Sequence, residues 1–175
     1  MNTANKLTLA RVVAIPLFIV LLYWDFPHHL WVALGVFILA SITDFVDGYV
    51  ARHYNQITDF GKFMDPLADK LLVMSAMAWF VEAGWMPAWA FFIVIARELA
   101  VTGMRLVAVE QGRVIAAGKS GKVKTASTMV GICLMLAFPT EPLILICTIV
   151  ILVTTVYSGV EYFVQNRDVF RDGAA

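Results

Sequence analysis

Four aspartates stand at helical spacing between residues 41 and 70 of an otherwise strongly apolar chain. Asp44 and Asp47 lie at positions i and i+3, and Asp65 and Asp69 lie at i and i+4, so each pair shares one face of a helix. Carboxylates at close range repel one another unless protons or cations neutralise them. Oxygen ligands without histidine or cysteine favour Mg²⁺ or Mn²⁺, and Mg²⁺ commonly also binds phosphate oxygens. The spacing therefore predicts a two-metal site for a phosphate-containing substrate.

The composition places these carboxylates in a membrane protein. Of the 175 residues, 61% are hydrophobic and 15% are charged, a balance typical of chains that lie in lipid. Residues 1–175 contain no internal repeat or linker, so we expect a single integral-membrane domain. Cys133 and Cys147 lie in apolar stretches, and we interpret them as buried hydrophobic side chains rather than as a disulfide or zinc site.

Apolar segments that could form helices follow one another along the chain. There are six, Leu7–Trp24, Leu30–Tyr49, Pro66–Val81, Pro87–Val109, Val123–Phe138 and Pro142–Val164. A membrane-spanning helix needs about 20 apolar residues, and only the last segment meets that without charges, from Pro142 to Val160. The first segment has no cleavage site after it, so we expect a retained helix rather than a signal peptide. Because charges facing lipid are costly, the charged ends of the other segments must face one another or water.

The distribution of basic residues predicts the orientation in the membrane. Lysines and arginines gather at the N-terminus, in two connections and at the C-terminus: Lys6, Arg11, Arg52, Lys62, Arg113, Lys119, Lys122, Lys124, Arg167 and Arg171. The alternate connections hold Asp25, Glu82 and Glu141 instead. By the positive-inside rule both termini are cytoplasmic. We therefore predict an all-α fold, a six-helix transmembrane bundle with a cytoplasm-facing polar cavity that contains the aspartates.

A less specific interpretation exists for single acids in this region. Asp65 precedes Pro66, which is typical of a helix N-cap followed by proline at the first helical position. Asp59 has no partner at helical spacing, and we expect it to lie in a loop. Solvated carboxylates could explain any one aspartate, but they explain four on neighbouring helices poorly.

The aspartates belong to a longer pattern. Asp44-x-x-Asp47-Gly48-x-x-Ala51-Arg52, then eight residues, then Gly61-x-x-x-Asp65-x-x-x-Asp69, resembles the signature of the CDP-alcohol phosphatidyltransferase family. The stretches "NKLTLARVVAIP", "ARELAVTGMRLVAVEQG" and "GKSGKVKT" resemble the phosphatidylglycerophosphate synthase branch of that family. The resemblance covers nearly the whole chain and is weakest over the last apolar segment.

The resemblance implies a reaction and its partners. Such enzymes transfer the phosphatidyl group of CDP-diacylglycerol to an alcohol and release CMP, and in this branch the alcohol is sn-glycerol 3-phosphate. The family fold is a six-helix transmembrane bundle, usually a homodimer, with its site on the cytoplasmic side of a bacterial-type cell membrane. We expect membrane lipids as further partners and no nucleic acid.

The resemblance also assigns roles to the signature residues. Asp44, Asp47, Asp65 and Asp69 would hold two Mg²⁺ or Mn²⁺ ions on the diphosphate. Asp69 would also be the general base, although it could act as a metal ligand alone. Residues expected to contact CDP-diacylglycerol are Asn5, Thr8, Gly48, Ala51, Arg52, Thr58 and Gly61. Close helix packing for Gly48, a loop hydroxyl for Thr58, and helix capping for Asn5 and Thr8 are the alternatives.

A second, basic set could bind the phosphate of the acceptor. Arg97 and Arg105 stand eight residues apart, on the same side of the expected helix, and Arg97 lies well inside an apolar segment. Glu98 follows Arg97 but lies on another face, so we expect a neighbouring helix or a substrate anion to neutralise Arg97.

Three lysines complete this predicted acceptor site. Lys119, Lys122 and Lys124 lie at the cytoplasmic start of the fifth apolar segment. They could instead satisfy the positive-inside bias and attract anionic lipid headgroups. Charge alone does not distinguish glycerol phosphate from inositol phosphate, and the branch resemblance makes that choice.

Other classes of protein and other acceptors remain as alternatives. Inositol or serine could replace glycerol phosphate within the same family. A membrane prenyltransferase also uses aspartates and Mg²⁺ but lacks this glycine, alanine and arginine pattern. A di-iron bundle needs Glu-x-x-His, which His28, His29 and His53 do not supply. A non-enzymatic ion transporter could place acids on an ion path, but it would release no CMP.

Overall fold

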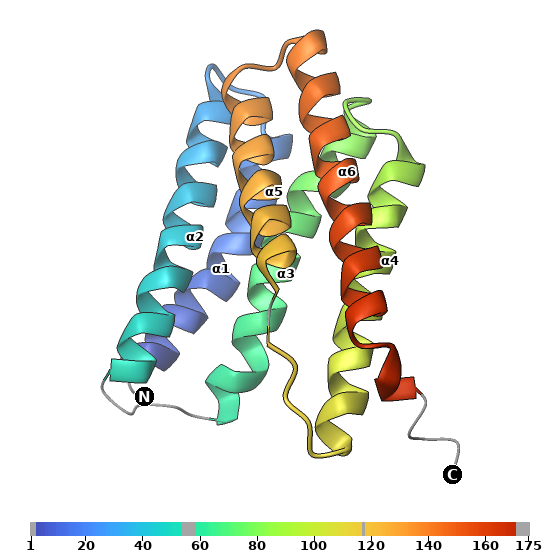
Figure 1. The fold of residues 1–175 in the computed structure, drawn as a ribbon. Coiled ribbons are helices and arrows are strands. Elements are labelled where there is room, and N and C mark those ends of the chain that lie inside the picture. The colour runs from blue at the N-terminus through green and yellow to red at the C-terminus, as the bar shows by residue number, and fades with distance from the viewer. Residues whose placement is uncertain (1–2, 54–58, 117, 171–175) are drawn as a thin grey trace. The chain divides into compact units, whose positions relative to one another are not determined.

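The computed structural model describes residues 3–53, 59–116 and 118–170, and within these ranges it leaves undescribed the side chains of residues 3–9, 11, 44–53, 59–66, 69 and 170. In the described residues the fold is all-helical and contains no strand. The helices are α1 (Thr3–Tyr23), α2 (His29–His53), α3 (Asp59–Glu82), α4 (Ala88–Glu110), α5 (Lys119–Ala137) and α6 (Glu141–Gln165), followed by the short 3₁₀ helix η1 (Arg167–Phe170) (Figure 1). This confirms the prediction of six helical segments, whereas η1 was not predicted.

The start of α3 differs from the prediction. The helix begins at Asp59, so Asp65 and Pro66 lie inside it, and the prediction that Asp65 caps the helix with Pro66 at its first position is wrong. Asp59 is the first residue of α3 rather than a loop residue. Proline is a strong predictor of a helix start because it lacks an N–H, but α3 continues through it.

Glycine ends α4 by a specific set of hydrogen bonds. Gly112 has φ 73°, a left-handed conformation that residues with a Cβ rarely adopt. Its N–H donates to the carbonyl of Val109 at 2.9 Å, and the N–H of Arg113 donates to the carbonyl of Ala108 at 2.8 Å. This is the Schellman arrangement, which satisfies the last carbonyls of a helix. It also turns the chain so that Arg113 follows directly after the end of α4.

The chain forms two compact units, the first comprising Met1–Phe80 with Leu136–Pro139 and the second comprising Val81–Met135 with Thr140–Ala175. In the first unit α1 contacts α2. Phe18 and Phe37, both fully buried, meet with ring centroids 5.7 Å apart. Trp31 on α2 meets Phe138 edge to face at 5.8 Å. Offset and edge contacts of this kind stabilise aromatic pairs beyond their buried area.

In the second unit α4 contacts both α6 and η1. A buried cluster joins these three elements, and it consists of Val101, Met104, Ala108, Tyr162 and Val169. The side-chain amide of Gln111 donates to the carbonyl of Val169 at 3.0 Å. Residues far apart in the sequence are therefore held together at the end of α4.

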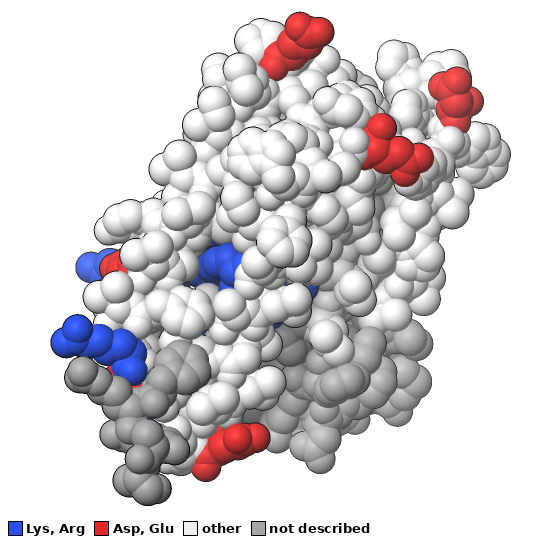
Figure 2. Space-filling model, turned by 90° about the vertical axis from the view of Figure 1, so that its right-hand side faces the viewer, with Lys and Arg blue, Asp and Glu red and all other residues white. Residues whose placement is uncertain are grey.

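Large apolar side chains are exposed on the surface of the described residues. Within the described residues, α6 is the helix long and apolar enough to cross a membrane. It exposes large apolar side chains, including Leu145, Val153 and Val164, each 61% exposed, and exposed apolar surface on this scale marks an interaction surface. Much of the surface drawn in Figure 2 is likewise uncharged. The hydroxyls of Ser41 and Thr43 donate to carbonyls one turn back, of Phe37 and Leu39, so they need no water.

Candidate functional site

The four predicted metal ligands lie on two helices of the first unit. Asp44 and Asp47 lie on α2, and Asp65 and Asp69 lie on α3, so each pair does occupy a single helix. Their side chains are outside the described set. The donor set fits the predicted ions, because four carboxylates at helical spacing supply only hard oxygen ligands. The two-metal site stays a prediction.

The predicted nucleotide contacts belong to the same unit. Asn5 and Thr8 lie on α1, and Gly61 lies on α3. Gly48, Ala51 and Arg52 lie on α2, whereas Thr58 falls outside the described residues. The side chains of the others are undescribed as well, so these assignments stay predictions.

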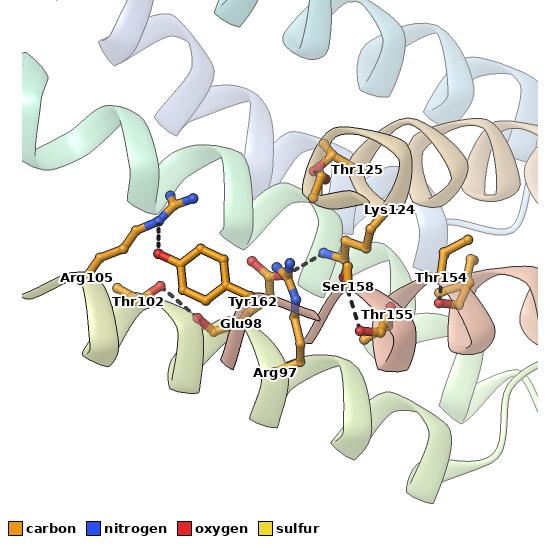
Figure 3. Close-up of polar contacts among 12 residues, drawn as sticks. Arg97, Glu98, Thr102, Arg105, Lys124, Thr125, Thr154, Thr155, Ser158 and Tyr162 are labelled. Atoms are coloured by element: carbon orange, nitrogen blue, oxygen red, sulfur yellow. Dashed lines mark hydrogen bonds and ion pairs between the residues drawn. The ribbon is translucent and has the colours of Figure 1, made fainter. Parts of the chain in front are cut away.

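The structure describes the predicted acceptor residues in more detail, beginning with a buried ion network (Figure 3). Arg97 Nη1 donates to Glu98 Oε1 at 2.8 Å, and Lys124 Nζ lies 2.5 Å from the same oxygen. The three side chains are only 13%, 15% and 7% exposed, in the order Arg97, Glu98, Lys124. One carboxylate thus links α4 to α5 and neutralises one of two buried cations, so the network retains one positive charge.

Glu98 corrects one sequence prediction. We expected Glu98 to lie too far around the helix to neutralise Arg97, but the two side chains bend together and form an ion pair. The spacing argument failed because an arginine side chain is long enough to reach a neighbour in sequence. The side chain that reaches this pair from another helix is Lys124. It is positively charged like Arg97, so it pairs with Glu98 and does not neutralise Arg97.

Gly159 makes room for Arg97, and Gly121 lies at ordinary contact distance from it. A Cβ at Gly159 on α6 would lie 3.2 Å from Arg97 Cγ, and a Cβ at Gly121 on α5 would lie 3.8 Å from Arg97 Nη2. Arg97 Nε is buried and has no hydrogen-bond partner among the described residues. A buried donor without a partner is costly. Arg97 therefore retains one donor that a bound anion could satisfy.

Arg105 makes a separate contact on α4. Its Nε donates to the hydroxyl of Tyr162 on α6 at 3.1 Å, and its guanidinium carbon lies 5.5 Å from the centre of the Tyr162 ring. Unlike Arg97, Arg105 is exposed. The prediction that Arg97 and Arg105 lie on one side of a helix is consistent with both reaching α6, through Gly159 and Tyr162 respectively.

The remaining predicted lysines lie at the start of α5. Lys119 and Lys122 are exposed. Lys119 borders an open pocket of about 450 Å³ between α5 and α6, whose further lining is Ser120, Val123, Val153, Thr154, Tyr157 and Glu161. Lys124, in contrast, is buried in the ion network. The three lysines therefore occupy different environments, although they are close in sequence.

An exposed ion pair lies past the end of α4. Arg113 Nη2 donates to Asp168 Oδ2 at 2.5 Å, and this hydrogen bond is the main cause that holds the pKa of Asp168 below its usual value. Sequence reasoning did not identify this pair or Tyr162. Both depend on contacts between α4 and the C-terminal part of the chain, and no local pattern predicts such contacts.

Comparison with known proteins agrees with the signature. The sequence profile of the CDP-alcohol phosphatidyltransferase family matches residues 1–158. A Bacillus subtilis protein named CDP-diacylglycerol--glycerol-3-phosphate 3-phosphatidyltransferase is 41% identical, over 97% of this chain and 97% of its own. A Mycobacterium tuberculosis protein named probable phosphatidylglycerophosphate synthase is 40% identical, over 96% of this chain and 83% of its own.

A third relative, from Salmonella typhimurium, bears the same name as the Bacillus protein. It is 39% identical over 79% of this chain and 78% of its own. The family profile covers all the signature positions, from Asp44 to Asp69, as well as the ion network of Arg97, Glu98 and Lys124. The chain therefore belongs to the CDP-alcohol phosphatidyltransferase family.

Proposed function

We propose that this protein transfers the phosphatidyl group from CDP-diacylglycerol to sn-glycerol 3-phosphate, forming phosphatidylglycerophosphate and releasing CMP. The single observation that carries the proposal is the 41% identity to the Bacillus subtilis relative over 97% of both chains. The relative's name states this donor, this acceptor and this reaction type. The complete aspartate signature in α2 and α3 is consistent with it.

For the mechanism, we propose that the four aspartates would hold two Mg²⁺ or Mn²⁺ ions. Such ions, when bound, would draw charge from the diphosphate. Asp69 would accept the proton of the acceptor hydroxyl. Because a nearby cation lowers the basicity of Asp69, its contribution to the rate would come mainly from its position next to that hydroxyl. The hydroxyl oxygen forms a bond to the phosphorus that carries diacylglycerol, and the bond from that phosphorus to the CMP oxygen breaks, with the electron pair leaving on CMP.

The basic residues of the second unit would bind the phosphate of glycerol phosphate. Arg97 and Lys124 support this role because their network keeps one positive charge and one unused donor. Arg105 supports it because its exposed guanidinium is held at a fixed place. Lys119 and Lys122 would attract the anion from the surface. A neutral acceptor such as serine or inositol would have no use for this excess of positive charge.

We also propose the membrane arrangement that the charges predict. All six helices would cross a bacterial cell membrane, with both termini and a polar cavity on the cytoplasmic side, and two copies would form a homodimer. Support comes from the apolar length of α6 and the exposed apolar side chains. In a variant whose Cys133 and Cys147 are replaced by alanine, labelling single cysteines introduced at residue 3 and in the connection after α5 from either side of sealed vesicles tests the orientation.

One assay tests the reaction. Purified protein in detergent, given CDP-diacylglycerol, Mg²⁺ and labelled glycerol 3-phosphate, should release CMP and form one labelled lipid in equal amounts. Parallel reactions with inositol phosphate, inositol and serine test the acceptor. Release of CMP with one of these and not with glycerol phosphate would replace our acceptor while keeping the family, whereas no CMP with any acceptor would contradict the proposed reaction.

A further inference from the structure

Tyr162 connects the predicted acceptor site to the apolar core of the second unit. Its side chain is only 7% exposed and packs in the cluster with Val101, Met104, Ala108 and Val169. Its carbonyl accepts hydrogen bonds from the backbone and the side-chain amide of Asn166, at 3.2 and 2.8 Å. A ring that is packed on one side and anchored through its backbone has little freedom to move.

The polar end of this fixed ring meets Arg105. The hydroxyl accepts the Nε–H at 3.1 Å, and the guanidinium carbon lies 5.5 Å from the ring centre, within the range of a cation–π contact. A buried tyrosine hydroxyl needs a partner. Arg105, in turn, is an exposed side chain that would otherwise sample several rotamers. The contact therefore satisfies Tyr162 and holds Arg105 in one orientation.

The hydrogen bond uses only one edge of the guanidinium. In Figure 3 the Nε of Arg105 faces the hydroxyl of Tyr162, and the two terminal nitrogens lie farther from Tyr162. Among the described residues these two nitrogens have no hydrogen-bond or ion-pair partner. Two parallel N–H donors at the end of a planar guanidinium match two oxygens of a phosphate. With Nε occupied by Tyr162, that pair of donors stays available for an anion.

We propose that Tyr162 is a positioning residue for acceptor binding: it holds Arg105 so that the terminal nitrogens receive the phosphate of the acceptor. The inference rests on the proposed function and names a residue outside the family match, which ends at residue 158. Tyr162 itself touches no substrate. Its contribution is to remove the conformational freedom that Arg105 would otherwise lose on binding the anion.

The test compares Tyr162→Phe with the parent protein in steady-state assays of CMP release. Phenylalanine keeps the packed ring and removes the oxygen that Nε–H uses. Because Arg105 would then lose side-chain freedom on binding the anion, the KM for glycerol 3-phosphate should rise about three- to tenfold. The kcat and the KM for CDP-diacylglycerol should stay unchanged. Tyr157→Phe is the matched control, because Tyr157 lies on the same helix but is 64% exposed, and the hydrogen bond of Arg105 goes to Tyr162 instead.

A double substitution separates positioning from general packing. Arg105→Lys keeps the charge but has no Nε–H for Tyr162 to hold, so Tyr162→Phe should have no further effect on the acceptor KM in that background. If the two effects simply multiply, or if Tyr162→Phe raises both KM values equally, the positioning role is wrong. Should Tyr162→Phe fail to fold, Arg105→Lys tests the required role of Arg105, and an unchanged acceptor KM in that variant would overturn the inference.

The outcome also distinguishes this inference from the proposed function. If the unmodified protein releases no CMP with glycerol 3-phosphate, the proposed reaction fails before any variant is compared. If the unmodified protein is active and Tyr162→Phe matches Tyr157→Phe in every constant, the reaction stands and only the role of Tyr162 is lost.

Discussion

Lys124 Nζ on α5 lies 2.5 Å from Glu98 Oε1 on α4, and the same oxygen accepts the Nη1–H of Arg97 at 2.8 Å. A single carboxylate therefore holds two buried cations from different helices. Removing one partner of a buried ion pair leaves an uncompensated charge, which usually costs more than the pair itself contributes. Glu98 is thus both a link between α4 and α5 and the group that makes two neighbouring cations compatible.

Replacing Glu98 should destabilise the second unit. Glu98→Gln keeps the shape of the side chain but leaves Arg97 and Lys124 without an anion, so the free energy of unfolding should fall by about 3–5 kcal/mol. Thermal unfolding in detergent measures the change. Glu110→Gln is the matched control on the same helix, because Glu110 is exposed, and it should change stability by no more than about 0.5 kcal/mol. Equal effects of the two substitutions would contradict a structural role for the network.

Removing Arg105 should weaken acceptor binding selectively. Arg105→Ala deletes a charged donor pair, so the KM for glycerol 3-phosphate should rise about ten- to a hundredfold. The KM for CDP-diacylglycerol should change little. Arg113→Ala is the control, because Arg113 follows the same helix but pairs with Asp168. A larger change in the KM for the liponucleotide than in that for glycerol phosphate would remove Arg105 from the acceptor site.

Asp69→Asn should abolish turnover while leaving the protein folded. Asparagine keeps the size of the side chain but supplies neither a base nor a second charged ligand oxygen. CMP release is the readout, and chelation of divalent ions in the unmodified protein should have the same effect. Asp59→Asn, at the start of the same helix and outside the signature, should remain active. Full activity of Asp69→Asn would exclude this residue from the mechanism.

Two glycines of the second unit should respond in opposite ways to alanine. A Cβ at Gly131 on α5 would lie 3.0 Å from Ile151 Cδ1 and 3.3 Å from Ile151 Cγ1, so Gly131→Ala should overpack the contact with α6 and lower stability by about 1 kcal/mol. A Cβ at Gly103 on α4 would meet nothing within 4 Å. Gly103→Ala should be neutral or stabilising by up to about 1 kcal/mol, because alanine favours helices. Thermal unfolding of the two variants under identical conditions compares them, and a reversed order would show that the described spacing at Ile151 is wrong.

The Arg113–Asp168 pair should give a small pH dependence of stability in acid. The hydrogen bond from Arg113 lowers the pKa of Asp168, so the pair contributes fully above the unfolded-state pKa of about 3.9. The contribution disappears as pH falls through the lowered folded-state pKa. Melting curves of the parent and Asp168→Asn should therefore differ at neutral pH and converge as the acid range is entered. A difference in melting temperature that grows toward low pH would contradict the lowered pKa of Asp168. The difference should be small at every pH because the ion pair is exposed.

The apolar runs of the sequence and the breaks between them predicted the helices of this fold well. The six apolar segments correspond to six helices, because long runs of apolar residues between proline and glycine breaks favour helices that satisfy most of their backbone groups internally. The bounds were less predictable at Pro66, where the expected helix start proved to be a point inside α3. A proline indicates where one hydrogen bond is missing, but it does not reveal whether the surrounding contacts maintain the helix through it.

The candidate site was predictable to the extent that its residues are near in sequence. The aspartate signature needs only the spacing within α2 and within α3, and a single sequence contains that spacing. The partner of Arg97 was predicted incorrectly, and Tyr162 was not identified, because side-chain reach and contacts across 57 positions have no local signal. Such contacts depend on how α4, α5 and α6 pack, which the pattern of any one segment does not encode.

The buried cluster that contains Tyr162 joins residues that lie far apart in the sequence, and this separation has a consequence for synthesis of the chain. Translation delivers α1 and α2 consecutively, so this helical hairpin can pair as soon as it leaves the ribosome. Met104 and Ala108 on α4 must wait for Tyr162 and Val169, which are made more than fifty residues later. The nascent polypeptide therefore keeps part of α4 uncovered until its last helical turn has emerged, and that interval is when it most needs lipid or a chaperone to cover it.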